Sequence, residues 1–184
     1  NTVIIYTSDH GSHFKTRNGE YKRSCHDACL RIPMIVCGPG FEGGEINGNL
    51  ASLIDLPKTV LSIAGAEVPE GWQGMNLQQA VGGDLGREAV FAQISEDHTG
   101  RTIRTKQWKY AVWLPEESAF WTEQEHSGDI VYQERFLYDL ENDPHERNNL
   151  IKAPEHTELR GELAEMLKAE MAQANESVPM IVPA

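Results

Sequence analysis

Apolar residues follow two patterns along this chain, short runs and longer stripes at helical spacing. The short runs are rich in β-branched and aromatic residues, which is typical of strands. They predict strands at Thr2–Thr7, Met34–Cys37, Ala89–Ile94, Trp108–Trp113 and Phe136–Leu140. We expect the first two to be buried, because short apolar runs of this kind are typical of buried strands. Arg101–Thr105 lies just before Trp108–Trp113 and predicts a hairpin with it.

Three longer segments predict helices. Ser24–Arg31 carries Ser24 and Asp27 in a capping-box pattern and ends before a proline. The helix predicted at Ser52–Ala64 has an apolar stripe formed by Leu56, Val60, Leu61 and Ala64. The helix predicted at Pro154–Ala174 has an apolar face formed by Leu159, Leu163, Met166, Met171 and Ala174.

The order of these elements predicts an α/β fold in two parts. A glycine-rich connector runs from Pro69 to Gly86, and a boundary within 82–86 gives domains 1–85 and 86–184. We expect the second domain to be a small α+β subdomain with antiparallel strands and one long terminal helix. Residues 115–134 predict a long polar insertion, and residues 177–184 predict a tail.

Composition narrows the range of partners. The chain has 184 residues and a formal net charge of −12, which argues against broad binding to nucleic acid. The stretch from Lys15 to Arg31 is nevertheless locally basic, so it is either an anion site or a solvated face. No apolar run approaches the length of a membrane span. The three cysteines do not form a closed disulfide framework and predict buried free thiols.

The first predicted strand is followed by candidate metal ligands, Asp9 and His10. Ligands commonly bind beyond the carboxyl ends of strands in α/β sheets. A carboxylate suits hard cations such as Ca²⁺ or Mg²⁺, and an imidazole suits zinc and related metals. Two ligands cannot hold such an ion alone, and the alternative is that Asp9 caps a following helix.

The basic stretch supplies candidates for anion chemistry. The ammonium group of Lys22 could hold a tetrahedral oxyanion, or it could be an exposed loop lysine. His13 and His26 are candidates for proton transfer or hydroxyl contacts, because an unperturbed histidine titrates near neutral pH. Arg17 is a further candidate for binding an anionic substrate.

Several ordered motifs resemble the sulfatase family. The chain reads TSDHG, then Lys22, His26-Asp27 and an Arg-Ile-Pro triplet, followed by MIVCGPG. The family commonly reads TSDHG or TSDNG, then Lys-x-x-x-Tyr-Glu-x-x-x-Arg-Val-Pro, an apolar strand and Gly-Pro-Gly. The resemblance continues through LASLIDLPKTVLSIAGAEVPEGWQGMNL, IRTKQWKY and LYDLENDPHERNNL. It covers nearly the whole chain and corresponds to the C-terminal half of the catalytic domain, with its mixed or parallel sheet layer, and to the C-terminal subdomain.

The resemblance implies roles for three residues. Asp9 and His10 would bind the active-site divalent cation, usually calcium, and Lys22 would contact the substrate sulfate. The family nucleophile is a formylglycine made from Cys or Ser in a Cys/Ser-x-Pro-x-Arg motif. The segments that begin at Cys37 and Ser177 have the proline but lack the arginine, so we expect the nucleophile and the other acidic ligands upstream.

Two departures concern substrate preference. His26 stands where the family usually has Tyr, which makes it a candidate catalytic or selectivity residue, and Asp27 stands where it usually has Glu. His98 is a candidate at the mouth of the substrate cleft, because this subdomain borders the cleft in relatives; the alternative is a surface loop histidine.

The function implied is the C-terminal portion of a metal-dependent sulfatase acting on sulfate esters, with a sulfated saccharide or small molecule as substrate. We expect the chain alone to be inactive without the N-terminal part of the same protein. The alternatives are a phosphatase or phosphonate hydrolase on the same scaffold, or a non-catalytic module that binds sulfated sugar. The resemblance favours a periplasmic, secreted or lysosome-like compartment, and the sequence itself does not indicate one.

Overall fold

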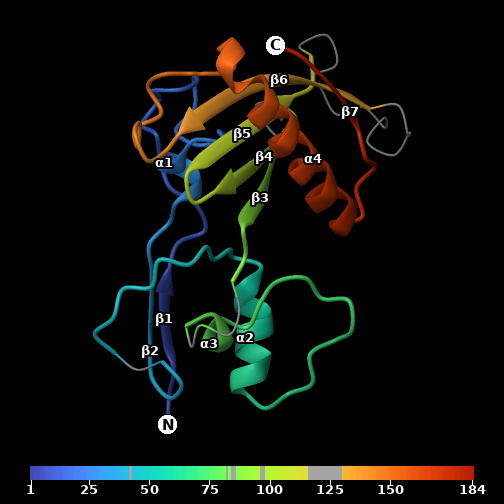
Figure 1. Cartoon of the computed structure of the whole chain (residues 1–184). Coiled ribbons are helices and arrows are strands. Elements are labelled where there is room, and N and C mark those ends of the chain that lie inside the picture. The colour runs from blue at the N-terminus through green and yellow to red at the C-terminus, as the bar shows by residue number, and fades with distance from the viewer. Residues whose placement is uncertain (42, 82, 84–85, 96–97, 116–129) are drawn as a thin grey trace. The chain divides into compact units, whose positions relative to one another are not determined.

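The computed structural model describes the whole chain except residues 42, 82, 84–85, 96–97 and 116–129 (Figure 1). The chain divides into two compact units, each built from two stretches of sequence. The first unit comprises Asn1–Asp9 and Ile32–Val90, and the second comprises His10–Arg31 and Phe91–Ala184. The insertion predicted at 115–134 lies largely outside the described residues.

The first unit contains a two-stranded antiparallel sheet. β1 (Ile4–Thr7) pairs with β2 (Met34–Cys37) in the register Ile4↔Cys37 to Thr7↔Met34, so both predicted strands are confirmed. The expected burial is wrong for the chain as it stands, because exposed and half-buried residues alternate along both strands. The exposed fractions of Ile4, Tyr6 and Ile35 are 61%, 63% and 63%.

The helix α2 (Asp55–Ile63) packs through polar groups, together with the short helix α3 (Leu77–Val81). Asp55 is fully buried, and its carboxylate accepts hydrogen bonds from the backbone N–H groups of Ser52 and Met75 at 2.7 and 2.8 Å. Thr59, also fully buried, accepts one from the N–H of Leu77 at 2.9 Å. The predicted apolar stripe is therefore not the buried face: Val60 and Ala64 of that stripe are exposed.

A mixed sheet with the strand order β3-β4-β5-β6-β7 forms the core of the second unit. Its strands are β3 (Ala89–Ile94), β4 (Gly100–Thr105), β5 (Trp108–Trp113), β6 (Val131–Asp139) and β7 (Met180–Val182). The predicted β4–β5 hairpin is confirmed. β6 begins earlier than expected, and the predicted tail contains β7, which pairs in parallel with β6.

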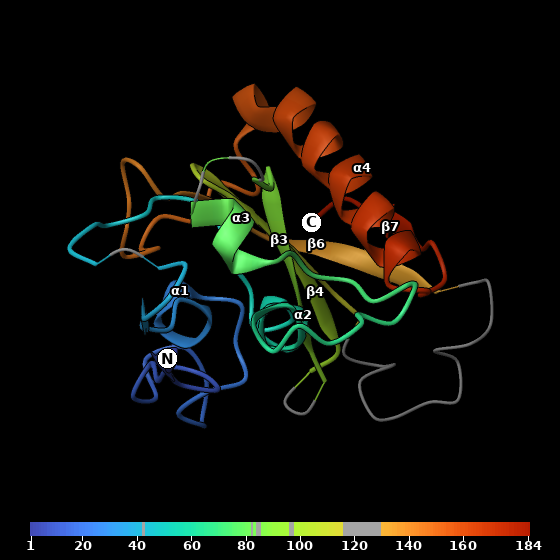
Figure 2. The same ribbon diagram turned by 90° about the horizontal axis from the view of Figure 1, so that it is seen from below.

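The two faces of this sheet are covered by different segments (Figure 2). After a 3₁₀ turn at Pro154–His156, the long helix α4 (Thr157–Gln173) lies on one face. Its buried residues are Leu163, Ala164, Leu167 and Met171, so the predicted face is only partly correct. The His10–Arg31 segment, with the one-turn helix α1 (Asp27–Leu30), lies on the other face.

The alternation of side chains along β5 explains why two different layers can share one sheet. Lys109 and Ala111 point toward the His10–Arg31 segment, where Ala111 packs with Cys25 in the core. Tyr110 points the other way and donates a hydrogen bond to Glu134, which is bound by Arg160 of α4. Successive side chains of a strand face opposite sides of a sheet.

The compact units differ from the sequence-based division at 1–85 and 86–184. Residues 86–90 group with the first unit, and His10–Arg31 group with the second, where Arg17 donates to the backbone carbonyl of Glu146. The sequence-based division stays a prediction. Within the described part of the chain, no helix is long and apolar enough to cross a bilayer.

Candidate functional site

The loop between β1 and α1 holds Lys22 by its backbone. The carbonyl oxygen of Lys22 accepts hydrogen bonds from His13 Nε2 at 3.0 Å and Asn18 Nδ2 at 3.1 Å. His13 is 2% exposed, and its own backbone N–H donates to the carbonyl of Tyr21 at 2.8 Å. Through these contacts His13 closes the loop that carries Lys22. Substrate contact by His13 stays a prediction.

The side chains of Lys22 and His10 meet at this loop. Lys22 Nζ lies 3.1 Å from His10 Nε2, and His10 Nδ1 lies 2.8 Å from the carbonyl oxygen of Gly11. A carbonyl oxygen can only accept and an ammonium group can only donate. The proton of the neutral ring therefore sits on Nδ1, and Nε2 carries the lone pair.

This tautomer fits a metal-binding role for His10. Ligating histidines almost always donate their second ring N–H to a carbonyl or carboxylate, which fixes the ring and leaves the other nitrogen for the metal. Asp9, an exposed carboxylate, is the adjacent candidate ligand. Among the described residues, no group of three or more His, Cys, Asp or Glu side chains gathers as a metal site. A divalent cation held here would thus need ligands in addition to these two.

Backbone strain is concentrated in the same segment. Phe14, Lys15 and Arg23 have φ values of 50°, 62° and 65° in the left-handed region. This conformation costs roughly 1–2 kcal/mol for a residue other than glycine, and strained residues cluster at functional sites. Two of these residues are in the turn after His13, and Arg23 directly follows Lys22, so the strain accompanies the side chains predicted to bind sulfate.

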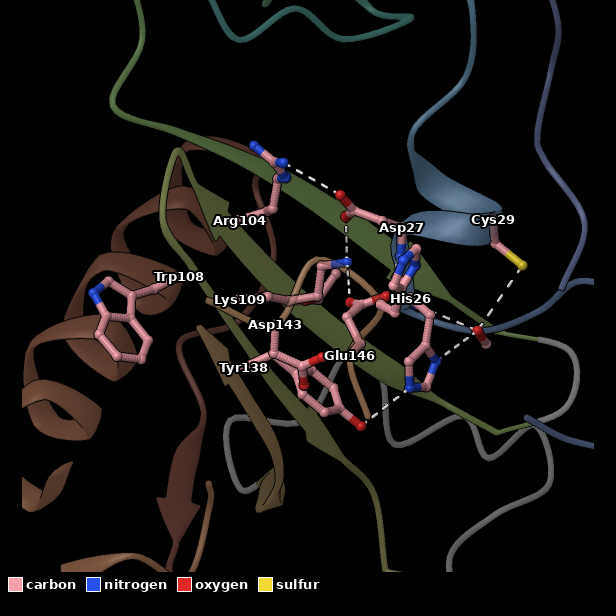
Figure 3. Close-up of polar contacts among 12 residues, drawn as sticks. His26, Asp27, Cys29, Arg104, Trp108, Lys109, Tyr138, Asp143 and Glu146 are labelled. Carbon is pink, nitrogen blue, oxygen red and sulfur yellow. Dashed lines mark hydrogen bonds and ion pairs between the residues drawn. The ribbon is translucent and has the colours of Figure 1, made fainter. Parts of the chain in front are cut away.

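His26 packs against Tyr138 of β6 (Figure 3). It is 3% exposed; its Nδ1 lies 2.9 Å from Ser24 Oγ, and its Nε2 lies 3.2 Å from the hydroxyl of Tyr138. Burial, reinforced by the positive charges of Arg17 and Lys109, lowers the pKa of His26 from 6.5 to about 3. The ring is therefore neutral near pH 7 and engaged at both nitrogens, and its predicted catalytic role is not tested by these contacts.

Next to His26, a network of buried charges joins α1 to the sheet (Figure 3). Lys109 is fully buried and forms ion pairs with Asp27 and, at 2.6 Å, with Glu146. Arg104 binds the second oxygen of Asp27 at 3.2 Å. Burial alone would raise the pKa of Asp27, but Lys109 and Arg104 outweigh it and hold that pKa below its usual value.

The start of α1 is capped by this network. Glu146 accepts a hydrogen bond from the backbone N–H of Asp27 at 2.7 Å, and no side-chain cap is formed by the residue that precedes the helix. The capping box predicted from Ser24 and Asp27 is thus not formed, because Ser24 bonds to His26 and Asp27 bonds to two cations. Sequence reasoning missed Lys109 and Glu146, although a lysine inside the apolar strand WKYAVW indicates a buried partner.

The two remaining candidates, Arg17 and His98, contact other parts of the chain. The guanidinium of Arg17 donates to the backbone carbonyl oxygens of His145 and Glu146 at 2.7 and 2.8 Å. His98 is 8% exposed, and its ring stacks on Trp113 with a centroid distance of 3.4 Å. The structure therefore brings His10, His13 and Lys22 together, while substrate binding by Arg17 and His98 stays a prediction.

Comparison with known proteins relates this arrangement to sulfatases. The chain is 32% identical over 170 residues to arylsulfatase K of Canis lupus familiaris, an alignment that covers 85% of this chain and 29% of the relative. It is 27% identical over 191 residues to N-acetylglucosamine-6-O-sulfatase of Bacteroides thetaiotaomicron, covering 97% of this chain and 32% of the relative. The chain thus spans about a third of the length of these relatives.

Solved structures share the fold. One, determined in complex with its substrate D-glucosamine-2-N,6-O-disulfate, superposes with a TM-score of 0.71 at 26% identity and covers 94% of this chain and 34% of the solved one. Residues 19–173 match the family model of the C-terminal region of N-sulphoglucosamine sulphohydrolase. With the family's order of motifs and a match over most of its length, this chain belongs to the sulfatase family as a C-terminal domain of the N-sulphoglucosamine sulphohydrolase type.

Proposed function

We propose that the parent protein hydrolyses sulfate esters on a carbohydrate, and that this chain supplies the sulfate-binding lysine and two of the metal ligands. The observation that carries the proposal is the 3.1 Å approach of Lys22 Nζ to His10 Nε2, with the tautomer of His10 set by the Gly11 carbonyl. A cation that takes the Nε2 lone pair in place of Lys22 would leave the ammonium group free to bind a sulfate beside the metal.

Each residue has a defined task in this proposal. Lys22 neutralises charge on the sulfuryl oxygens, and its strained, hydrogen-bonded loop fixes the ammonium group before substrate arrives. Asp9 and His10 would hold a divalent cation, for which calcium is the first candidate. Such a cation, when bound, supplies Lewis-acid polarisation of the sulfate. The formylglycine nucleophile and the remaining ligands would come from the N-terminal part of the same protein.

The proposed substrate class follows the relatives. One relative is named for a sulfate on N-acetylglucosamine, and a neighbour was solved with a disulfated glucosamine. Both are sugar sulfates, so a sulfated saccharide is the substrate that we propose for the parent.

The proposed partner is the rest of the parent protein. The exposed side chains of Ile4, Tyr6 and Ile35 form alternate positions of a two-stranded sheet. Exposed apolar surface of this kind marks an interaction site. We propose that the N-terminal part of the parent covers it, as expected if the relatives' additional length completes the catalytic domain.

The test uses the full-length parent enzyme and measures release of inorganic sulfate from an aryl sulfate and from sulfated glucosamine. Lys22→Ala should lower kcat/KM at least about a hundredfold, since removal of one donor to a developing charge commonly costs that much. Lys152→Ala removes an exposed lysine and should leave kcat/KM within about twofold. Equal activity of the Lys22→Ala variant and the wild type would overturn the role of Lys22.

Two further measurements distinguish the alternatives. The 184-residue chain alone, with calcium, should not release sulfate from an aryl sulfate, and sustained turnover would contradict the proposed need for the N-terminal part. A parent enzyme that hydrolyses phosphate or phosphonate esters faster than sulfate esters would be a phosphatase or phosphonate hydrolase. Metal-independent binding of sulfated sugar that Asp9→Ala leaves unchanged, without hydrolysis, would indicate a binding module.

A further inference from the structure

Three charged side chains form a network that has no part in the proposed chemistry: Lys109 and Glu146 are buried, and Asp27 is partly buried. Lys109 is fully buried between the carboxylates of Asp27 and Glu146. Buried charges are costly unless they are paired and hydrogen bonded, and their best-attested use is to select one arrangement of the chain over others. The arrangement in contact with this network is the His10–Arg31 segment.

Glu146 binds this segment on both sides of Lys22. Its side chain accepts a hydrogen bond from the N–H of Asp27 at 2.7 Å, five residues after Lys22. Its backbone carbonyl accepts one from Arg17 Nη1 at 2.8 Å, five residues before Lys22. The second nitrogen of the same guanidinium binds the carbonyl of His145 at 2.7 Å. One glutamate therefore anchors both ends of the stretch that presents the lysine.

The turn that carries Glu146 has a strained backbone at Glu146 and is stabilised by hydrogen bonds to Asp143. The φ angle of Glu146 is 54°, in the left-handed region that glycine or asparagine adopts with less strain. The preceding turn is held by Asp143, whose carboxylate accepts hydrogen bonds from the N–H groups of Arg147 and Asn148, each at 2.7 Å. Any residue could supply the backbone carbonyl that Arg17 binds, so the choice of glutamate at this strained position is explained by its carboxylate, which binds Lys109 and the N–H of Asp27.

We infer that Glu146 is a positioning residue, which through Asp27 and Arg17 fixes the loop on which Lys22 and His10 meet. The inference deepens the proposed function and rests on it, because Lys22 is the group whose placement matters for catalysis. Glu146 touches no reacting atom and acts through the segment that it anchors.

The chain offers a matched control in Glu134. This glutamate is also buried, 8% exposed, and its carboxylate is bound by Arg160 at 2.5 Å and Tyr110 at 3.2 Å. Its partners lie on the α4 side of the same sheet, so it has the same chemistry without contact to the Lys22 loop. Glu146→Gln and Glu134→Gln each remove one buried negative charge from the same unit.

The experiment compares these variants in the full-length enzyme by amide hydrogen exchange and by steady-state kinetics. Glu146→Gln should raise exchange at least about tenfold in peptides from 10–31 and leave peptides from 157–173 unchanged, and Glu134→Gln should do the reverse. At a temperature well below both melting points, kcat/KM should fall at least about tenfold for Glu146→Gln and less than about threefold for Glu134→Gln.

Unchanged exchange in 10–31 for Glu146→Gln, or an equal rise for Glu134→Gln, would overturn the inference. If the wild-type enzyme fails to hydrolyse sulfate esters, the proposed function fails alone, and the exchange pattern still decides whether Glu146 positions the loop. If Glu146→Gln does not fold, Arg17→Ala removes an exposed side chain from the same anchor and should raise exchange in 10–31 to a similar extent.

Discussion

The buried imidazole of His26 should make the folded chain sensitive to mild acid. Its folded pKa of about 3 lies below the unfolded value of 6.5, because the ring is buried and faces the positive charges of Arg17 and Lys109. Between those two values the unfolded chain binds a proton at His26 that the folded chain excludes. The free energy of unfolding should therefore be fully retained above pH 6.5 and fall as the pH drops toward 3.

The magnitude follows from this difference in proton binding. Each pH unit well below 6.5 costs about 1.4 kcal/mol for one such group. At pH 6.5 the unfolded ring is already half protonated, so a drop from pH 6.5 to 4.5 should cost about 2.3 kcal/mol. For a chain of this size that corresponds to about 5–10 °C in Tm. Asp27 does not add to the loss of stability between pH 6.5 and 4.5. Its pKa is lowered from 3.8, so the stability that its carboxylate contributes is lost only at more acidic pH.

The assay is thermal unfolding followed by near-ultraviolet circular dichroism at pH 6.5, 5.5 and 4.5. The slope of Tm against pH should be shallower in His26→Gln than in the wild type, because glutamine does not titrate. His145→Gln, which removes an exposed imidazole, is the control and should retain the wild-type slope. Equal slopes for the wild type and His26→Gln would refute the argument that the imidazole is held neutral by its surroundings.

Further predictions concern the cysteines, the loop entry and the first unit. The expectation of buried thiols is correct for Cys25 and Cys29 and wrong for Cys37, which is exposed at the end of β2. Because burial also raises the pKa of the Cys25 thiol to about 12, iodoacetamide should modify Cys37 in the native chain and Cys25 only after unfolding, as peptide mass mapping would show. Gly11→Ala would drive a methyl group into a backbone carbonyl of α1 and should lower stability by about 1–3 kcal/mol in a denaturant titration; an unchanged midpoint would contradict the packing. Asp55→Asn should cost about 3 kcal/mol in the same assay, because Arg87 loses its buried partner, and a loss below about 1 kcal/mol would argue against that ion pair.

The strands were predictable because their signal is local. Met34–Cys37, Ala89–Ile94 and Trp108–Trp113 match the observed bounds, since β-branched and aromatic runs need no knowledge of distant partners. Burial was less predictable: in α2 the face turned inward is the polar one with Asp55 and Thr59. Their partners include the backbone N–H groups of Met75 and Leu77 and the side chain of Arg87, which no periodicity of the helix itself records.

Part of the candidate site could also be predicted, because its motifs are local in the sequence. The adjacency of Asp9 and His10 and the motif that carries Lys22 can be read from the sequence. Lys22 Nζ lies 3.1 Å from His10 Nε2, and the roles of these residues stay a prediction. The anchor beneath them could not be read, because Lys109 and Glu146 lie 82 and 119 positions after Asp27. A glutamate in a polar turn gives no sequence signal that it is buried.

The sequence separation within this anchor also bears on how the chain leaves the ribosome. Arg17 and the carbonyl of Glu146 are 129 positions apart, with most of the first unit synthesised between them. At about 5–20 residues per second, the segment with Lys22 would wait roughly 6 to 26 seconds before its anchor exists. Over that interval its basic side chains are open to chaperones and proteases, and nascent chains arrested before residue 146 should be cleaved within 10–31 far more readily than chains arrested after the end of α4.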